Sequence, residues 1–199
     1  QDDNKTILDA LGIEILQTPP EDVKTIKTQL GGCNSQYRRS FQVVNKRTQD
    51  AFDKFVKNAK ESRCRLFWHG SRNENWWSIL SSGLVLRPSN AVITGKMFGQ
   101  GLYFADRARK SLGYTSLRGS HWARGSANKG FMSLYNVHLG NSLRIKKHQS
   151  WCYDLTEKKL KNRGDYDSLF AEGGIDLRNN EFIVYNQNQC TINFLVEIA

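Results

Sequence analysis

Apolar residues at helical spacing mark the clearest single element of the chain. Phe52, Phe55 and Val56 fall on one face of a helix covering residues 45–60, because side chains three and four positions apart share a face. Asn45 stands before this run, where a short polar side chain can accept a hydrogen bond from a free backbone N–H. The pattern predicts a capped helix that packs one face on a sheet.

The first part of the chain carries weaker helical patterns. Residues 5–16 have apolar positions at approximate helical spacing, two adjacent prolines interrupt them, and residues 21–30 form a second predicted helix that opens with acidic residues. We therefore predict an N-terminal helical extension over residues 1–37 and a main domain over residues 38–199.

Apolar and polar residues alternate in several short runs, a period-two pattern that is typical of β-strands. The predicted strands cover residues 38–44, 64–68, 102–105, 131–140, 181–186 and 190–199. Several strands and few helices together predict an α+β fold with antiparallel sheets.

Two short helices are predicted between these strands. One runs through residues 76–80 and ends at Gly83, and the other runs from Lys110 to Tyr114 with Asp106 as its N-cap. No repeat, low-complexity stretch or linker composition divides the chain. We therefore expect one hydrophobic core.

The chain is basic, with 29 Lys and Arg against 19 Asp and Glu and a net charge of +10. Such a charge attracts anionic partners without selecting one, so a dinucleotide, a nucleic acid and an acidic protein all fit. The basic residues are dispersed in pairs, and no nucleic-acid motif accompanies them. The longest apolar runs are well short of the ~20 residues that span a bilayer, so no membrane partner is expected.

The cysteines are widely spaced, at Cys33, Cys64, Cys152 and Cys190. They form no CxxC pair or Cys/His cluster of the kind that zinc requires, so we expect free thiols and no metal. No secretory leader is visible in the sequence. An intracellular location is therefore expected, with nucleus and cytoplasm both compatible.

Three separated segments place polar groups at the edges of predicted strands. They are WHGSR at 68–72, GQGLYFADRARKSLGY at 99–114 and NNEFIVYN at 179–186. Glycines spaced as in the second segment bind dinucleotides when a strand precedes them and a helix follows. Here GQGLYF precedes a strand, so a Rossmann site is rejected. The order and spacing of the segments together carry the functional signal.

The motifs LFWHGSR, MFGQGLYFAD, KSLGY and NEFIVYN resemble, in this order and spacing, those of poly(ADP-ribose) polymerase catalytic domains, which are diphtheria-toxin-like ADP-ribosyltransferases. The resemblance covers residues 38–199, and the QVVNK segment at 42–46 looks most like tankyrase-type members. It implies two packed antiparallel β-sheets, with a few flanking helices, that clasp NAD. It also implies transfer of ADP-ribose from NAD to a protein acceptor or to the enzyme itself, with release of nicotinamide.

The resemblance implies a catalytic set of His69, Tyr103 and Glu181. Glu181 would stabilise the oxocarbenium-like ribose that forms as nicotinamide leaves, because a nearby carboxylate stabilises developing positive charge. A glutamate here is compatible with chain elongation as well as first transfer. We therefore expect an NAD-dependent ADP-ribosyltransferase that makes poly(ADP-ribose), with mono-transfer as the alternative.

Five residues are expected around the nicotinamide end of NAD. The resemblance implies that His69 bonds a ribose hydroxyl and that Gly70 grips the carboxamide through its backbone groups. It implies further that Ser111 bonds the carboxamide and that Tyr103 lines the pocket. Tyr114 would stack on the nicotinamide ring, since an aromatic face attracts a flat cation.

Further NAD contacts are expected from five other residues. Lys110 would lie near the nicotinamide pocket, and Ser71 and Asn75 fall at positions that look like contacts for the adenosine end. Arg87 and Lys96 belong to the loop that resembles the family's donor-site loop. Both are candidates for contact with the pyrophosphate.

The chain also departs from the family pattern. Tankyrase-type members carry a Cys/His zinc loop before the strand at 131–139, whereas this chain has GSHWARGSANKG there and no cysteine. The basic segment 142–180 corresponds to the acceptor loop, whose charges suit an acidic protein, a growing polymer or nucleic acid. A silent NAD/ADP-ribose-binding module, an RNA 2′-phosphotransferase and a nucleic-acid-binding domain are the competing interpretations, and Glu181 with its companion motifs disfavours all three.

Overall fold

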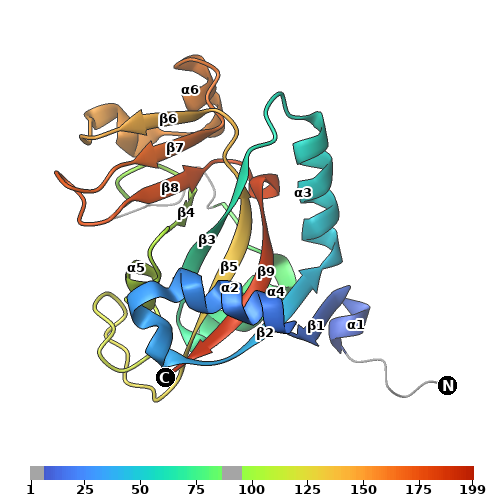
Figure 1. The fold of residues 1–199 in the computed structure, drawn as a ribbon. Coiled ribbons are helices and arrows are strands. Elements are labelled where there is room, and N and C mark those ends of the chain that lie inside the picture. The colour runs from blue at the N-terminus through green and yellow to red at the C-terminus, as the bar shows by residue number, and fades with distance from the viewer. Residues whose placement is uncertain (1–6, 87–95) are drawn as a thin grey trace.

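The computed structural model describes residues 7–86 and 96–199. In that part of the chain the strands form two sheets, which Figure 1 shows one above the other. The five-stranded sheet has the order β1 (Ile13–Gln17), β2 (Tyr37–Asn45), β9 (Cys190–Ile198), β5 (Gly130–His138) and β3 (Cys64–Ser71). The four-stranded sheet has the order β4 (Leu102–Phe104), β8 (Glu181–Val184), β7 (Ser168–Ala171) and β6 (Ser142–Ile145). The α+β prediction with two sheets is confirmed.

Short helices surround the two sheets. The α-helices are α1 (Ile7–Ala10), α2 (Pro20–Leu30), α3 (Lys46–Asn58), α4 (Trp76–Ser82), α5 (Ala108–Leu112) and α6 (Glu157–Asn162). The 3-10 helices are η1 (Gly31–Gln36), η2 (Asn73–Asn75), η3 (Ser150–Asp154) and η4 (Gln187–Gln189). Within the described residues no helix has the length and apolar character needed to cross a membrane.

Aromatic side chains pack the two sheets against each other. Phe67 of β3 stacks on Phe182 of β8 with ring centroids 4.3 Å apart, and Phe182 stacks in turn on Phe170 of β7 at 4.5 Å. Phe67 and Phe182 are both buried. Burying a side chain of this size stabilises a fold by roughly 1.5–3 kcal/mol. This aromatic stack is therefore a major packing contact between the two sheets.

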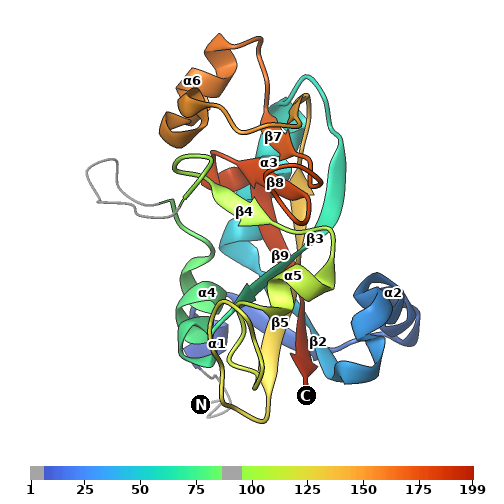
Figure 2. The same cartoon turned by 90° about the vertical axis from the view of Figure 1, so that its left-hand side faces the viewer.

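Helices cover both faces of the five-stranded sheet. Ile26 of α2 packs in one apolar cluster with Met132 of β5, whereas Ile79 of α4 packs in another with Tyr135 of β5. Figure 2 shows α2 and α4 on opposite sides of this sheet. The five-stranded sheet is therefore the layer between α2 and α4.

The predicted helix after Asn45 is confirmed. α3 follows that residue directly, and the Asn45 side chain accepts a hydrogen bond from the backbone N–H of Thr48 at 3.3 Å. Phe52 points inward and is 3% exposed. Cap and apolar face both lie within one short segment, which is why the sequence pattern was sufficient here.

The helix predicted over residues 5–16 is wrong for its second half. α1 ends at Ala10, and Ile13–Gln17 is the strand β1, which pairs antiparallel with β2 at the edge of the sheet. The segment predicted as a helical extension, residues 1–37, therefore contributes a strand to the main sheet. Pairing with β2 satisfies the backbone groups of this segment and overrides its weak helical spacing. The domain boundary at residue 38 stays a prediction.

The second sheet is mixed rather than antiparallel. β6 runs parallel to β7, with Ser142 beside Ser168, while β4, β8 and β7 pair antiparallel. A parallel pair needs a long crossover connection, and the chain between β6 and β7 supplies one that contains η3 and α6. β6 and β7 were not predicted from the sequence, because each has only four residues and they flank a segment rich in Lys and Arg.

The predicted cap at Asp106 is also wrong. α5 begins at Ala108 with Arg107 in the N-cap position and without a side-chain cap. Asp106 instead accepts a hydrogen bond from the Asn180 side chain at 3.1 Å. Asp106 lies one residue before the N-cap position, so its carboxylate bonds to the residue before Glu181 rather than to the helix.

Candidate active site

The three sequence motifs meet where the two sheets join. His69 lies near the end of β3, Tyr103 is the middle residue of β4, and Glu181 is the first residue of β8. β4 pairs with β8, placing Tyr103 opposite Ile183. Backbone bonds of 2.8 and 3.0 Å between Trp68 and Ala105 connect β3 to the end of β4. Residues far apart in the sequence are thus brought to one place.

His69 is held as a neutral imidazole. Its Nδ1 is 3.4 Å from the backbone oxygen of Tyr103, a partner that can only accept, so Nδ1 carries the proton in this contact. Burial lowers the pKa of His69 from 6.5 to about 4, the hydrogen bond to Tyr103 opposes this shift, and the charge of Lys96 adds to it. At neutral pH the Nε2 atom is therefore an acceptor.

Tyr103 is fixed by its hydroxyl as well as by its strand. The hydroxyl donates to the backbone oxygen of Gly99 at 2.8 Å and accepts from the backbone N–H of Phe98 at 3.0 Å. Burial raises the pKa of this phenol, so it stays protonated. The Lys96 ammonium lies 4.8 Å from the centre of the Tyr103 ring. The ring, rather than the hydroxyl, is the part of Tyr103 that a substrate can contact.

Glu181 forms an ion pair with Lys110. The Lys110 Nζ and Glu181 Oε1 atoms are 2.5 Å apart, and both side chains are only 13% exposed. The negative charge of Glu181 contributes to raising the pKa of Tyr103 and of Tyr114, after burial as the main cause. A partly buried carboxylate oriented by a lysine acts strongly on nearby charge, because the interior screens it weakly.

Gly70 and Ser111 lie in close contact. A Cβ atom at Gly70 would be 2.0 Å from the backbone oxygen of Ser111, so only glycine fits beside α5. Ser111 is 3% exposed. Its backbone oxygen accepts a hydrogen bond from the Tyr114 N–H at 3.0 Å. The structure thus places Gly70, Ser111 and Tyr114 close together. α5 ends at Leu112, so Tyr114 lies beyond the helix that was predicted to include it.

The residues expected at the adenosine end are more open. The Asn75 side-chain amide donates to the Ser71 hydroxyl at 3.0 Å, and Asn75 is exposed. Lys96 approaches the Tyr103 ring, whereas Arg87 lies outside the described residues. The Trp76 indole N–H also donates to the Ser71 backbone oxygen, at 3.2 Å.

Two groups of contacts around the site were missed in the sequence. The Tyr185 hydroxyl donates to the Phe98 backbone oxygen at 2.6 Å, and His148 contacts the Met97 backbone oxygen at 2.6 Å. Both contacts anchor residues 97–99, whose backbone forms the hydrogen bonds to the Tyr103 hydroxyl. Trp122 stacks on Tyr114 with ring centroids 6.0 Å apart. These pairs join segments distant in the chain, and no local pattern marks them.

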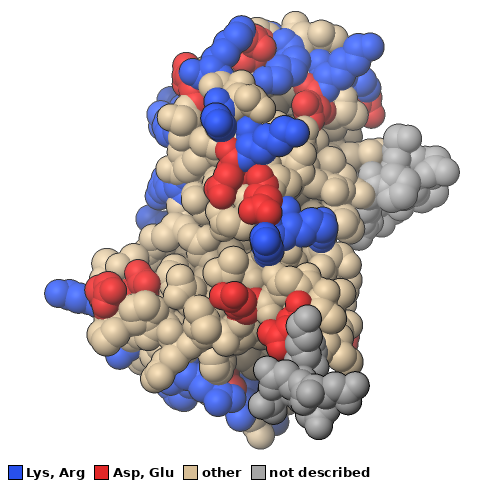
Figure 3. Space-filling model, turned by 90° about the vertical axis from the view of Figure 1, so that its right-hand side faces the viewer, with Lys and Arg blue, Asp and Glu red and all other residues tan. Residues whose placement is uncertain are grey.

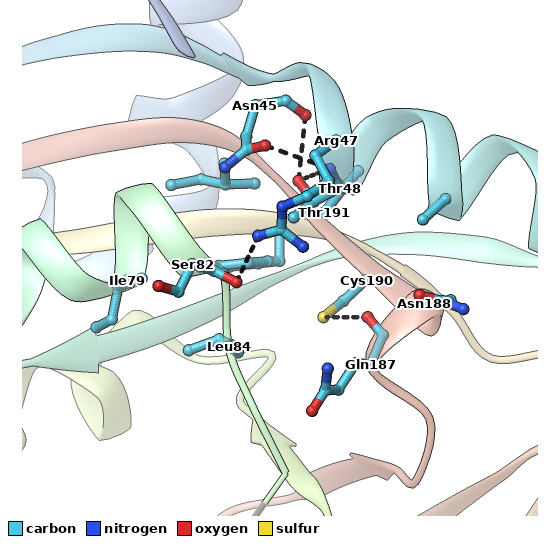
Figure 4. A pocket seen from close by; sticks show the side chains of 14 residues that line it. Asn45, Arg47, Thr48, Ile79, Ser82, Leu84, Gln187, Asn188, Cys190 and Thr191 are labelled. Carbon is cyan, nitrogen blue, oxygen red and sulfur yellow. Dashed lines mark hydrogen bonds between the residues drawn. The ribbon is translucent and has the colours of Figure 1, made fainter. Parts of the chain in front are cut away.

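A separate small pocket lies away from these residues. Figure 4 shows it between α3, α4 and η4, where the Arg47 guanidinium donates to the Ser82 backbone oxygen at 2.8 Å. Its volume of about 40 Å³ is enough for one or two water molecules. Small-molecule sites measure several hundred Å³, so this pocket does not compete with the strand junction as the binding site for a dinucleotide.

Basic side chains gather on another part of the surface. Figure 3 shows Lys and Arg over the end of the molecule that carries α6, with acidic side chains between them. Arg144 pairs with Glu172 at 2.5 Å and Lys161 pairs with Asp167 at 2.5 Å. Such pairs partly neutralise this surface, so the positive charge of the chain does not by itself indicate nucleic-acid binding.

Comparisons with known proteins place the chain among relatives of one family. The model of the poly(ADP-ribose) polymerase catalytic domain matches residues 21–199. A poly(ADP-ribose) polymerase-like protein of Invertebrate iridescent virus 6 is 30% identical over 184 residues, covering 89% of this chain and 94% of its own length. Poly(ADP-ribose) polymerase 2-A of rice is 28% identical over 211 residues, and human poly(ADP-ribose) polymerase 2 is 32% identical over 157. The match covers 92% and 67% of this chain, but only 31% and 26% of those two relatives.

Proposed function

The chain belongs to the family of poly(ADP-ribose) polymerase catalytic domains, which are NAD-dependent ADP-ribosyltransferases, and we propose that it uses His69, Tyr103 and Glu181 to transfer ADP-ribose to a protein acceptor. The bond between ribose C1′ and the nicotinamide nitrogen breaks, an acceptor oxygen bonds to C1′ with inversion, and the acceptor proton is released. NAD is the donor substrate, and no metal takes part in this scheme.

The observation that carries the proposal is the position of Glu181. This carboxylate lies at the strand junction with His69 and Tyr103 and is oriented by Lys110 at 2.5 Å. As nicotinamide leaves, positive charge develops on the ribose, and a preorganised carboxylate stabilises that charge without reorganising. The same oxygen atoms can polarise an acceptor hydroxyl. The ion pair with Lys110 limits the rotation of the Glu181 side chain.

The other residues supply binding and orientation in this proposal. The Nε2 atom of neutral His69 accepts a hydrogen bond from a ribose hydroxyl, and the backbone of Gly70 binds the carboxamide together with Ser111. The ring of Tyr114, which is 42% exposed, is free to stack on the pyridinium. A neutral imidazole suits this place because a charged one would oppose the cationic ribose.

Polymer synthesis is the finer part of the proposal. A glutamate at position 181 and the resemblance to poly(ADP-ribose) polymerases support elongation, with protein carboxylates or serines, on this enzyme or on another protein, as first acceptors. The basic segment from β6 to β8 is proposed to hold an acidic target or a growing polymer. An intracellular location, in nucleus or cytoplasm, is proposed as well and is tested by fractionating cells that express the tagged protein.

The test uses the purified chain, its Glu181→Gln variant and labelled NAD. Nicotinamide release and label in the protein are measured together, the latter on a denaturing gel. A high-mass smear that the variant lacks supports polymer synthesis, and one sharp band supports mono-transfer. Glu14→Gln, on the exposed edge strand β1, is the matched control and should behave as wild type. If wild-type protein binds NAD without release or label, the chain is a binding module.

A further inference from the structure

The loop between α5 and β5 is a folded unit beside the site. The Arg118 N–H bonds the Ala127 oxygen at 2.8 Å, and the Ala127 N–H bonds the Ser116 oxygen at 2.9 Å. The Gly125 N–H donates to the Ser120 hydroxyl at 2.7 Å. Figure 1 shows this loop next to α5. Because these hydrogen bonds fix the backbone of the loop, the loop can hold a side chain in a defined position.

Trp122 is hydrogen-bonded through its backbone to Gly113, the residue before Tyr114. The backbone N–H groups of Trp122 and Ala123 both donate to the Gly113 oxygen at 2.9 Å. A Cβ atom at Gly113 would be 2.8 Å from Cδ1 of the Trp122 indole. Gly113 has ordinary helical dihedrals, with φ at −62°. Glycine is therefore required at this position because a Cβ atom would contact neighbouring atoms, of which the Trp122 indole is the nearest.

The Trp122 indole lies nearly parallel to the ring of Tyr114. Their centroids are 6.0 Å apart and their planes differ by 19°. Trp122 remains 59% exposed, whereas Trp68 and Trp76 are 1% and 5% exposed in the core. An indole so exposed contributes little hydrophobic stabilisation to the fold. Its contact with Tyr114 is its clearest structural role.

Tyr114 connects this pair to the catalytic carboxylate. Its backbone N–H bonds Ser111, the neighbour of Gly70. The charge of Glu181 is close enough to contribute to the raised pKa of the Tyr114 phenol. The aromatic pair therefore borders the end of the site where nicotinamide is expected.

We propose that Trp122 is a positioning residue for the nicotinamide end of the site, holding the Tyr114 ring in the orientation that stacks on the flat cationic ring of NAD. This inference rests on the proposed function. A ring that is already oriented loses less conformational entropy on binding. Aromatic stacking stabilises a bound ring beyond the burial of its surface, so the effect falls on affinity for the nicotinamide end.

The test compares Trp122→Ala with Trp122→Phe. KM for NAD, kcat, the inhibition constant of nicotinamide and the affinity for ADP-ribose are measured for each. Trp122→Ala should raise KM and the nicotinamide inhibition constant roughly three- to tenfold, with kcat and ADP-ribose affinity near wild type. Trp122→Phe should restore most of the loss. Gly113→Ala, which pushes the indole aside, should act in the same direction as Trp122→Ala.

Trp77→Ala is the matched control, since Trp77 is 55% exposed on α4 and lies outside the aromatic pair. Unchanged nicotinamide inhibition in Trp122→Ala overturns the inference. An equal loss of ADP-ribose affinity also overturns it, because that indicates general disruption, which circular dichroism checks. Failure of the proposed function is separate, since wild type would then release no nicotinamide.

Discussion

The two ends of the candidate site differ in how firmly their residues are held. At the end expected to bind nicotinamide, Gly70 lies against the backbone of Ser111, and Lys110 orients Glu181 through a 2.5 Å ion pair. At the end expected to bind adenosine, Ser71 and Asn75 share one hydrogen bond, and Asn75 is exposed. In the proposed reaction, bond cleavage takes place at the first end, where preorganised groups accelerate reaction. Uniform binding of the remote end does not raise kcat, so less rigidity suffices there.

The largest effect is expected on kcat when the carboxylate of Glu181, at the firmly held end of the site, loses its charge. Glu181→Gln keeps the size and a hydrogen-bond acceptor for Lys110 but removes the charge that we propose stabilises the ribose cation. We expect kcat for nicotinamide release to fall by roughly 10²–10³, with KM for NAD within a few-fold of wild type. Steady-state release of nicotinamide measures both constants. A kcat within threefold of wild type would show that the carboxylate charge is not used.

A smaller effect, on stability and NAD binding, is expected when a side chain is added at Gly70 in its close contact with Ser111. Gly70→Ala places a Cβ atom where the Ser111 backbone oxygen lies, at 2.0 Å, so β3 and α5 must move apart. Overpacking of this kind costs about 1–3 kcal/mol of unfolding free energy. Urea denaturation should show that loss, and NAD titration should show weakened binding. Gly32→Ala, with open space around its Cβ, is the control that should keep wild-type NAD affinity.

The neutral state of His69 predicts a pH dependence of stability. Its folded pKa of about 4 lies below the reference value of 6.5, so between these values the unfolded chain binds more protons. Stability contributed by this residue therefore falls as pH drops from about 6.5 toward 4. The wild-type free energy of unfolding should fall from pH 7 to pH 5 by an extra amount on the order of 1–2 kcal/mol relative to His69→Gln.

Urea denaturation at the two pH values measures this difference. His121→Gln, at an exposed position, should keep the wild-type dependence. Equal pH dependence in wild type and His69→Gln would mean that His69 is not held neutral by burial.

The smallest effect is expected at the open end. Asn75→Ala removes the 3.0 Å hydrogen bond to Ser71, an exposed interaction worth about 0.5–1.5 kcal/mol. KM for NAD should rise by roughly two- to tenfold while kcat is unchanged, and ADP-ribose affinity should fall in parallel. A fall in kcat instead would show that both ends of the site act in the chemical step.

Elements whose signals lie within a few residues were predictable from the sequence. The Asn45 cap and the buried Phe52 define α3 locally, and period-two alternation marked β5 and β9. Where the decisive partner is remote, the local pattern failed. β1 is a strand because it pairs with β2, and Asp106 bonds Asn180 instead of capping α5.

The sequence alone determined the family, the two-sheet fold and the identity of the candidate residues, because motif order and spacing are properties of the chain. The tertiary structure decided how those residues are paired. Lys110 and Glu181 are 71 positions apart, and Trp122 meets Tyr114 only because both the loop and α5 are anchored at Gly113. Such contacts depend on sheet register and on where a loop folds back, and these are set by the packing of the whole domain.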